Sequence, residues 1–331
     1  VLVANQTASV TCANNQGEIA ASASGGWGTY QFQLVNNTTS TTVQPYASNS
    51  LFTGLSAGNY TISVQDAGGC VISSTIILVQ PSLISATLTA TNTALLCFGD
   101  TNASVTATNV TGGQGVYQYI LNTYNTSGTT IVSSSGGQTS PTFNGLGAGI
   151  YSITITDGWN CDFTSNTVII TQPTPVVASL NLTSSLTCLN NAVITISASG
   201  GTAPYQYSSD GVTFSNNTTF NVGPGTYQYF VRDANNCAVV QTNQITINAI
   251  PALELNLNLN SATINCFGES TATIIANTTG GLGNYSYTLL DTANNVIAGP
   301  QNSGTFANLP AGDYIVRVDS NDCNAVSNVI Q

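Results

Sequence analysis

The side chains in this sequence that are best suited to chemistry are its eight cysteines, which occur in two sets of four. The first set is Cys12, Cys97, Cys188 and Cys266, and the second set is Cys70, Cys161, Cys237 and Cys323. The sequence has no His and no two Cys separated by two residues, which disfavours a zinc site. Paired Cys in a polar, strand-rich chain favour disulfides, and therefore an oxidising, extracellular setting.

An aspartate lies four residues before each cysteine of the second set, at Asp66, Asp157, Asp233 and Asp319. These carboxylates are weak candidates for calcium ligands, because calcium takes six to eight oxygen ligands. Only Glu18, Asp100 and Glu269 follow cysteines of the first set, and no acid follows the third one. We favour the alternative that each aspartate accepts hydrogen bonds from backbone N–H groups of a turn. We therefore expect no metal and no cofactor.

The remaining composition disfavours catalysis and several classes of partner. Without His or Lys, most base-activated nucleophiles are excluded. The 13 scattered acids do not single out a carboxylate pair for glycoside hydrolysis, so we expect that the protein is not an enzyme. Arg232 and Arg317 are the only cations and the net charge is −11, so nucleic acid is an unsuitable partner. No apolar run is long enough to span a membrane, and we expect no membrane insertion.

The cysteines belong to a unit that occurs four times along the chain. Each unit has a glycine pair followed by aromatic residues, as in GGWGTYQF at 25–32. A turn, a tyrosine, a strand, an aspartate and a cysteine follow, as in LSAGNYTISVQDAGGC at 55–70. The first-set cysteines of successive units are 78 to 91 residues apart, a length that suits an immunoglobulin-sized sandwich. We expect domains over 1–80, 81–172, 173–250 and 251–331, called repeats 1 to 4 below.

Alternating apolar residues predict half-buried strands, for example at Tyr60, Ile62 and Val64, and helix signals are nearly absent. The tyrosine after each turn resembles the tyrosine corner of Greek-key sandwiches. These tyrosines are Tyr60, Tyr151, Tyr227 and Tyr314. The linkers are short and contain Pro, as in QPSLIS at 80–85, which favours an extended connection. The predicted fold is all-β, with four tandem immunoglobulin-like Greek-key β-sandwich repeats that form a rod.

The repeated blocks resemble those of a known family. The glycine pair with Y-x-Y, then L-x-A-G-x-Y-x-I-x-V-x-D-x-x-x-C, then Q-P, is similar to the SprB-type repeat of Bacteroidota surface proteins. The resemblance covers essentially the whole chain as four copies, and the third copy departs most, with Val222-Gly-Pro in place of Leu-x-Ala. It implies part of a very large cell-surface adhesin that is exported by type IX secretion, a class that includes gliding-motility adhesins.

Two disulfide patterns remain open. One bond per repeat would pair Cys12–Cys70, Cys97–Cys161, Cys188–Cys237 and Cys266–Cys323. In an immunoglobulin-like topology, however, a Cys before strand B and a Cys after strand F lie at opposite ends of the module. A strand of about eight residues separates those ends by about 26 Å, whereas a disulfide needs Cα atoms within about 7 Å. The second pattern therefore joins consecutive repeats through Cys12–Cys161, Cys97–Cys237 and Cys188–Cys323, and leaves Cys70 and Cys266 for neighbours outside this segment.

Three functions are compatible with these features. In the leading hypothesis, the chain is a structural spacer segment of a long extracellular adhesin or filament used for attachment, gliding or contact with other cells. Its partners are then neighbouring repeats of the same longer chain. In a second hypothesis, each repeat is a carbohydrate- or protein-binding module, whose partner is a surface polysaccharide or another cell. In a third, the chain self-associates laterally into a multi-chain fibre through edge strands that lack Lys. Recurring tyrosines are expected in the core while the loops vary, which favours the spacer. Trp27 and Trp159 are expected to pack against neighbouring repeats.

Overall fold

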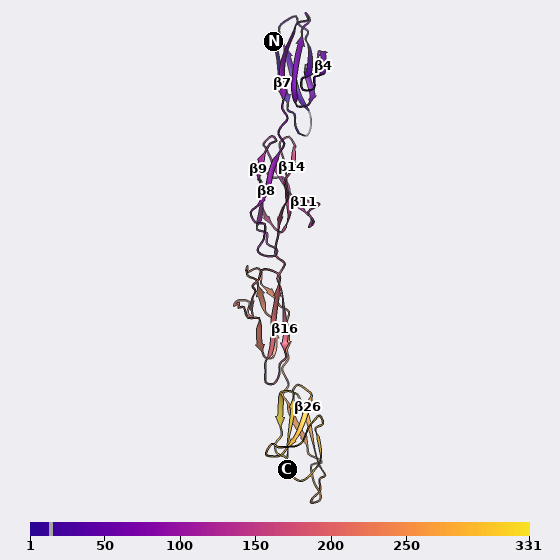
Figure 1. The fold of residues 1–331 in the computed structure, drawn as a ribbon, viewed down its shortest axis with the longest axis vertical. Coiled ribbons are helices and arrows are strands. Elements are labelled where there is room, and N and C mark those ends of the chain that lie inside the picture. Colours follow the sequence, from indigo (N-terminus) through magenta and orange to yellow (C-terminus); the bar gives the residue numbers. More distant parts are fainter. Residues whose placement is uncertain (13–15) are drawn as a thin grey trace. The chain divides into compact units, whose positions relative to one another are not determined.

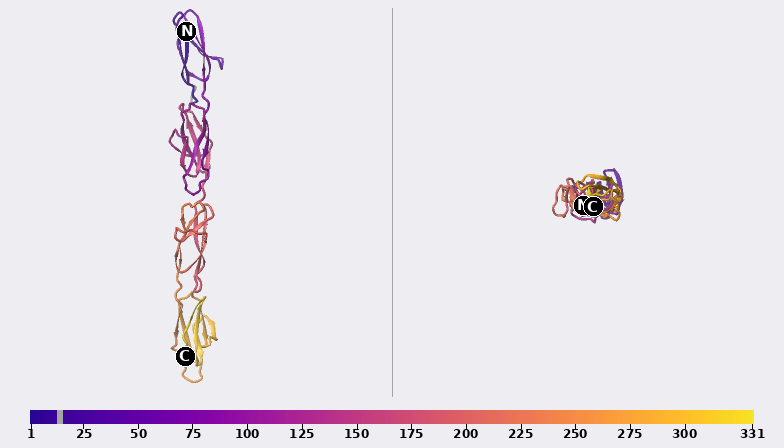
Figure 2. Two further views of the ribbon diagram at one scale, coloured as in Figure 1. Left: turned by 90° about the vertical axis from the view of Figure 1, so that its left-hand side faces the viewer. Right: turned by 90° about the horizontal axis from the view of Figure 1, so that it is seen from below.

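The computed structural model describes residues 1–12 and 16–331, which form strands, turns and irregular segments but no helix (Figures 1 and 2). No helix that could cross a membrane therefore occurs in this part of the chain. The chain divides into two compact units, Val1–Gln172 and Pro173–Gln331. Their boundary falls where the sequence predicts the boundary between repeats 2 and 3.

Repeat 1 has the strand order of an immunoglobulin-like sandwich. Its strands are β1 (Leu2–Ala8), β2 (Gly17–Ala23), β3 (Gln31–Asn36), β4 (Thr41–Ala47), β5 (Leu51–Leu55), β6 (Gly58–Gln65) and β7 (Val71–Leu78). One antiparallel sheet has the order β1–β2–β5, and the other has the order β4–β3–β6–β7. The chain changes sheet after β2, β4 and β5, so the strands correspond to A, B, C, C′, E, F and G of a Greek-key sandwich.

Repeat 2 completes the first unit with the same order. Its strands are β8 (Ser85–Ala90), β9 (Ala103–Thr111), β10 (Gln118–Tyr124), β11 (Ile131–Ser134), β12 (Thr142–Leu146), β13 (Gly149–Thr156), β14 (Asp162–Thr164) and β15 (Val168–Ile170). The sheets are β8–β9–β12 and β11–β10–β13–β14, and β15 also pairs with β13. Strand G is therefore present in two pieces.

The second unit contains two further sandwiches. Repeat 3 has β16 (Val177–Ser184), β17 (Ala192–Ser199), β18 (Gln206–Ser208), β19 (Thr219–Val222), β20 (Gly225–Tyr227), β21 (Phe230–Arg232), β22 (Val240–Gln241) and β23 (Ile245–Ile247). Repeat 4 has β24 (Glu254–Asn258), β25 (Ala272–Thr279), β26 (Tyr285–Leu290), β27 (Val296–Gln301), β28 (Thr305–Leu309), β29 (Ile315–Ser320) and β30 (Cys323–Val326). Repeat 4 has the sheets β24–β25–β28 and β27–β26–β29–β30. In repeat 3, β16–β17–β19 faces β18–β21–β22 and β20–β23, so strands F and G are both interrupted.

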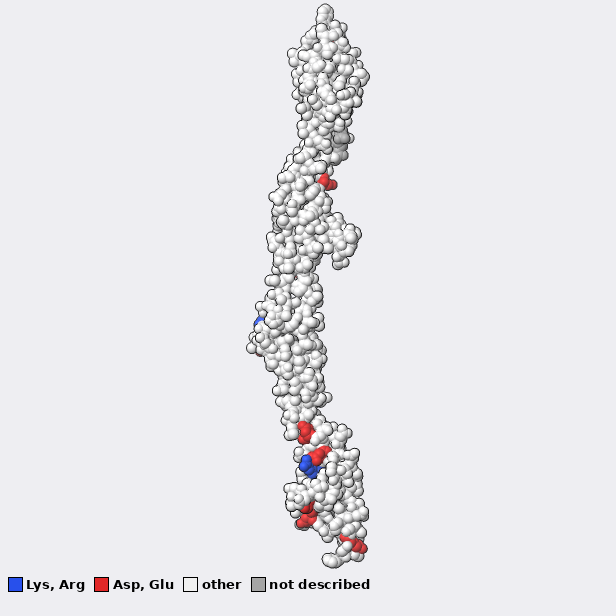
Figure 3. Space-filling view, in the orientation of Figure 1, with Lys and Arg blue, Asp and Glu red and all other residues white. Residues whose placement is uncertain are grey.

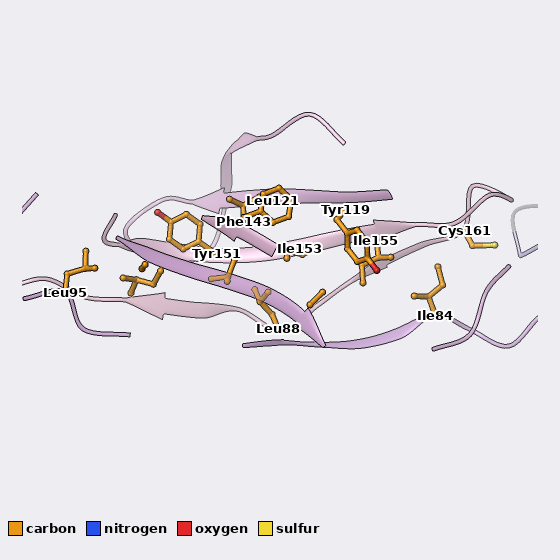
Figure 4. Packing of buried hydrophobic residues seen from close by; sticks show 14 residues of the cluster. Ile84, Leu88, Leu95, Tyr119, Leu121, Phe143, Tyr151, Ile153, Ile155 and Cys161 are labelled. Carbon is orange, nitrogen blue, oxygen red and sulfur yellow. The ribbon is translucent and has the colours of Figure 1, made fainter. Parts of the chain in front are cut away.

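Each repeat encloses its own hydrophobic cluster, because alternate residues of its strands point inward. In β6, Tyr60, Ile62 and Val64 are 1%, 0% and 4% exposed, as the alternation predicts. Arg317 lies on the opposite parity of β29 and is exposed. Figure 4 shows how side chains from both sheets of repeat 2 interdigitate. The predicted all-β, immunoglobulin-like Greek-key fold is therefore confirmed.

Candidate functional site at the repeat junctions

Disulfides join consecutive repeats within each unit. Cys12 of repeat 1 is bonded to Cys161 of repeat 2, with Cα atoms 5.7 Å apart. Cys188 of repeat 3 is bonded to Cys323 of repeat 4, with Cα atoms 5.2 Å apart. The pattern of one bond within each repeat is therefore wrong, and the pattern that joins consecutive repeats is present at both of these junctions.

The other four cysteines are of two kinds. Cys97 and Cys237 are also disulfide-bonded, and their bond to each other remains a prediction. Cys70 and Cys266 are free and exposed. The pattern that joins consecutive repeats leaves these two cysteines for neighbours outside this segment, and accordingly neither has a partner within it.

The direction of the strands explains why a repeat does not bond its own two cysteines. In repeat 2, Cys97 precedes strand B (β9) and Cys161 follows strand F (β13). Figure 4 shows Leu95, two residues before Cys97, at one end of the core and Cys161 at the other end. A bond between these two cysteines would have to span the length of the sandwich, far more than the about 7 Å between Cα atoms that a disulfide allows.

The aspartates of repeats 1 to 3 connect the F–G turn to the glycine-pair loop. Each carboxylate accepts hydrogen bonds from three backbone N–H groups at 2.8–3.2 Å. Asp66 accepts from Trp27, Gly68 and Cys70. Asp157 accepts from Gln114, Trp159 and Cys161. Asp233 accepts from Thr202, Asn235 and Cys237. One of the three donors is always the cysteine itself, so the aspartate fixes the backbone position from which the thiol projects.

These hydrogen bonds lower the pKa of Asp66 and Asp157 below the ordinary value of 3.8. For Asp66 the N–H of Trp27 has the largest effect, followed by that of Cys70. Burial raises the pKa of Asp157, but the N–H of Cys161 and two further backbone donors together outweigh it. Because N–H groups already point at these carboxylate oxygens, the geometry favours a structural role over calcium binding.

In repeat 4, Asp319 does not lie at the position that Asp66, Asp157 and Asp233 occupy, although it also precedes its cysteine by four residues. Its carboxylate forms an ion pair with Arg317 on β29, with a distance of 2.6 Å from Nη2 to Oδ1. Repeat 4 is one residue shorter between its corner tyrosine and Cys323, so counting back from the cysteine gives the wrong residue. The fully buried Ser320 stands in the aspartate position, and its Oγ accepts a hydrogen bond from the N–H of Leu282 at 2.8 Å.

Asp322 adds a polar contact across the junction of repeats 3 and 4. Its carboxylate accepts hydrogen bonds from the backbone N–H groups of Cys188 and Leu189, both at 3.2 Å. A hydrogen bond from the Thr187 side chain contributes most to lowering the pKa of Asp322. The group of Cys188, Asp322 and Cys323 has the spacing of a metal site. However, its two sulfurs are bonded to each other and are not available as thiolate ligands.

The glycine pairs hold the linkers that enter repeats 2, 3 and 4. The second glycine of each pair donates its N–H to a linker carbonyl: Gly113 to Ser82 at 2.8 Å, Gly201 to Thr174 at 2.7 Å and Gly281 to Pro251 at 2.9 Å. The first glycine has no room for a side chain, because a Cβ on Gly112 would lie 2.0 Å from the carbonyl oxygen of Leu83. The glycine pairs, which the sequence indicates only as turns, are thus the places where each linker is fixed to its repeat.

Two tyrosines in each repeat hold the loops near the junctions. The corner tyrosines donate to the carbonyl four residues earlier: Tyr60 to Ser56 at 2.8 Å, Tyr151 to Gly147 at 3.1 Å, Tyr227 to Gly223 at 3.0 Å and Tyr314 to Pro310 at 2.8 Å. This is the geometry expected of a tyrosine corner. A second set, Tyr30, Tyr117, Tyr205 and Tyr285, donates to the carbonyl of the first glycine of each pair. Sequence reasoning missed this second set, although the fixed spacing of five residues between that glycine and the tyrosine was a usable signal.

The two tryptophans have different surroundings. Trp159 packs against the hydrophobic cluster of its own repeat, whereas Trp27 is 79% exposed and lies beside Gly68 of the F–G turn. The expectation that Trp27 packs against a neighbouring repeat is therefore wrong within this chain. Charged side chains are sparse on the face in Figure 3, so uncharged groups cover most of that surface.

Comparisons with known proteins agree with the repeat organisation. The SprB repeat model matches residues 4–39, 87–126, 181–214 and 259–294. No curated protein matches the sequence. Among solved structures, the chain is similar to domains 1–6 of the surface layer protein SbsC, with 12% identity and a TM-score of 0.28 over 98% of this chain. The match covers 53% of that structure, so the chain spans about half of its length.

Two further structures align over nearly their whole length. The four N-terminal immunoglobulin domains of Dscam1 isoform 6.44 share 13% identity with a TM-score of 0.25, and the insect immune protein hemolin shares 11% with a TM-score of 0.29. Each match covers 98% of this chain and 97% of the other chain. The SprB repeats and the disulfides indicate an extracellular or surface protein. Matches to the SprB repeat model thus occur four times across the chain, once in each repeat, as in a SprB-type repeat array.

Proposed function

We propose that this chain is a structural spacer segment of a long extracellular adhesin or filament used for attachment, gliding or contact with other cells. The segment holds a binding region away from the cell surface and has no catalytic role of its own. Its partners are the neighbouring repeats of the same longer chain. Export by type IX secretion and a place at the cell surface belong to the same proposal, because they are what the SprB-type repeat implies.

The observation that carries the proposal is the covalent connection between consecutive repeats. The Cys12–Cys161 and Cys188–Cys323 bonds add a second covalent path beside each linker. The linkers themselves are hydrogen-bonded to the repeats that they enter, as Ser82 is to Gly113. Independent binding modules gain nothing from such connections, whereas a spacer under tension needs its joints to hold.

A second candidate function, binding by the repeats themselves, is favoured by one observation. The exposed indole of Trp27 is large and flat enough to stack on a sugar ring or a partner side chain. A hollow of about 250 Å³ lies on the same repeat and is lined by Gly26, Tyr30 and Asp66, among others. The other three repeats have Gln114, Thr202 and Leu282 at the position of Trp27, so such a site would be confined to repeat 1.

Two measurements on the oxidised full chain separate these functions. A compact globule of this length would have a radius of gyration of about 20 Å, and an extended spacer should exceed that value about twofold in small-angle scattering. A compact particle would contradict the spacer.

Binding to surface polysaccharides and to whole cells is measured in parallel, with Trp27→Ala as the matched variant. The spacer predicts no saturable binding by either protein, whereas saturable binding that Trp27→Ala abolishes would favour the binding module.

A further inference from the structure

We propose that repeat 3 carries a binding site for a carboxylate-bearing sugar, such as a hexuronate, in which the guanidinium of Arg232 holds the carboxylate. The site is a hollow of about 430 Å³ that is lined by Arg232, Gln206 and Asn216, among others. All of its lining residues belong to repeat 3. This inference goes beyond the spacer role, because that role does not involve Arg232.

The two cations of the chain differ in whether an acidic side chain neutralises them. The Nε and Nη2 atoms of Arg317 donate to the carboxylate of Asp319, at 2.9 and 2.6 Å. The same two atoms of Arg232 donate to the side-chain oxygen of Gln206, at 3.0 and 2.7 Å. That oxygen belongs to a neutral amide, and among the residues that the structure describes only Arg317 forms an ion pair. Arg232 therefore keeps an unneutralised positive charge in a chain of net charge −11.

Two neighbours hold the guanidinium of Arg232 in one orientation. Gln206 lies directly opposite Arg232 in the pairing of β18 with β21, and its oxygen occupies one edge of the guanidinium. The ring of Phe214 packs over the guanidinium, with its centroid 4.2 Å from Cζ. Within the described part of the chain, the remaining N–H donors on Nη1 and Nη2 have no acceptor. A carboxylate can accept two parallel hydrogen bonds from this pair of nitrogens.

Neither acid of repeat 3 competes for these donors. The carboxylate of Asp233 is 1% exposed and is held by the three backbone N–H groups described above. The carboxylate of Asp210 accepts hydrogen bonds from the Ser208 hydroxyl at 2.7 Å and from two backbone N–H groups at 2.8 Å. Repeat 3 contains no other acid and has one cation, so it repels an anion less than the other repeats do.

The rest of the hollow favours a sugar over a simple anion. The exposed amides of Asn216 and Asn236 both donate and accept hydrogen bonds, as the hydroxyl groups of a sugar do. Pro204 adds an exposed apolar ring, against which the C–H groups of a sugar ring can pack. A single cation suits the one charge of a carboxylate better than the nearly double charge of a phosphate group. A hexuronate combines one carboxylate with several hydroxyl groups on one ring.

The site is confined to repeat 3, so the other repeats are internal controls. Arg232 directly precedes the buried acid of the F–G turn. The corresponding residues are Gln65 in repeat 1, Thr156 in repeat 2 and Asp319 in repeat 4. None of these three side chains is a cation, and none can offer a carboxylate the paired N–H donors of a guanidinium.

The test follows the oxidised, ¹⁵N-labelled full chain by NMR while glucuronate is added. The chain has only two arginines, so the Nε–H signal that Arg317→Gln retains belongs to Arg232. This signal and the backbone amides of Ala234 and Asn236, which line the hollow, should shift together. The expected dissociation constant is about 1 mM, which a few hydrogen bonds to a charged group give at a partly exposed site. Signals of the other repeats should not shift.

Two further ligands separate the parts of this probe. Glucose has the ring and its hydroxyl groups without the carboxylate, and acetate has the carboxylate without the ring. Each should bind at least about tenfold more weakly than glucuronate, because each forms only some of the hydrogen bonds. Glucose or acetate that binds as tightly as glucuronate would overturn the proposal. So would the absence of any shift at about 50 mM glucuronate.

Three variants assign the binding to Arg232. Arg232→Gln should weaken glucuronate binding at least about tenfold, whereas the matched variant Arg317→Gln, which removes the other cation, should bind as the wild type does. Asn216→Ala changes an exposed residue outside the strands and should weaken binding about threefold. Unchanged affinity in Arg232→Gln would overturn the proposal. If that variant fails to fold, unchanged affinity in Asn216→Ala would overturn it instead.

The sugar site and the spacer role can fail independently. The spacer role rests on the disulfides between repeats, and none of these titrations changes them. Conversely, a dissociation constant of about 1 mM lies far above micromolar concentrations of the chain. One such site per chain therefore does not give saturable binding to polysaccharides or whole cells at those concentrations, so the site is compatible with the spacer.

Discussion

Pulling the oxidised chain by its two ends should release little length, because the disulfides divert force around most of each unit. Tension that enters at Val1 reaches Cys12 and passes through its bond to Cys161, so the residues between them carry none. The bond from Cys188 to Cys323 protects most of the second unit in the same way. Force can therefore strip strand A from repeats 1 and 3 and strand G from repeats 2 and 4, but it cannot extend the chain between the bonded cysteines.

The length that the bonds hide follows from their sequence separations of 149 and 135 residues. At about 3.5 Å per extended residue, the two loops hide about 520 Å and about 470 Å of chain. The residues left in the force-bearing path, 1–12, 161–188 and 323–331, then allow the oxidised protein an end-to-end length of at most about 160 Å before a covalent bond must break, whereas the reduced protein should reach about 1,000 Å more.

Single-molecule force spectroscopy with handles at both termini measures these lengths, first without and then with a reducing agent. The double variant Cys70→Ser, Cys266→Ser is the matched control, because it lacks only the free thiols and should reproduce both wild-type lengths. Release of the full chain length without reductant would refute the reasoning, and so would a released length that reduction does not change.

The single variant Cys12→Ser extends the same experiment to Cys97. Loss of the Cys12–Cys161 bond should expose about 520 Å if nothing else shields that loop. If Cys97 is bonded to Cys237, as the sequence predicts, that bond hides part of the loop and the gain should be about 370 Å. The length gained therefore identifies the partner of Cys97.

Three further predictions concern the stability of the junctions. In denaturant unfolding, Gly112→Ala should destabilise the protein by at least about 1 kcal/mol more than the control Gly115→Ala. Both positions have positive φ, but only at Gly112 would a Cβ collide with the linker. Equal effects of the two substitutions would contradict this. Tyr151→Phe should cost about 1 kcal/mol through loss of the 3.1 Å hydrogen bond to Gly147, and a neutral result would remove the tyrosine corner from the account. The pKa of Asp157 is lowered in the folded protein, so its ionised carboxylate stabilises the fold above pH 3.8, and this stabilisation is lost as the pH falls through the folded-state pKa. Asp157→Asn should therefore weaken the fall in the free energy of unfolding at acid pH. An unchanged pH dependence would reject this role.

The repeat organisation and the strands could be predicted from the sequence, because both depend on local patterns. Alternating residues such as Tyr60, Ile62 and Val64 determine which face is buried, and that alternation is visible without tertiary information. Two disulfide patterns stayed open from the sequence, because strand direction disfavours a bond within a repeat but depended on an inferred strand order. Choosing between them required the positions of Cys12 and Cys161 in different repeats, which no local pattern contains.

The features that sequence reasoning missed all depend on contacts between distant segments. The position of Asp319 relative to Cys323 matches the other repeats, but a deletion within the F–G hairpin moves the role to Ser320. The need for glycine at Gly112 comes from the linker backbone that crosses it, and the sequence gives no sign of that crossing. Trp27 was expected to be covered, because large aromatic residues usually are, yet its side of repeat 1 has no neighbour among the described residues.

Peptide mapping of the oxidised chain without reduction tests the central claim, that disulfides join consecutive repeats, most directly. Digestion with pepsin at low pH prevents disulfide exchange and avoids reliance on the two tryptic sites. The structure predicts peptides that link Cys12 with Cys161 and Cys188 with Cys323. Peptides that link Cys12 with Cys70, or Cys266 with Cys323, would contradict the account.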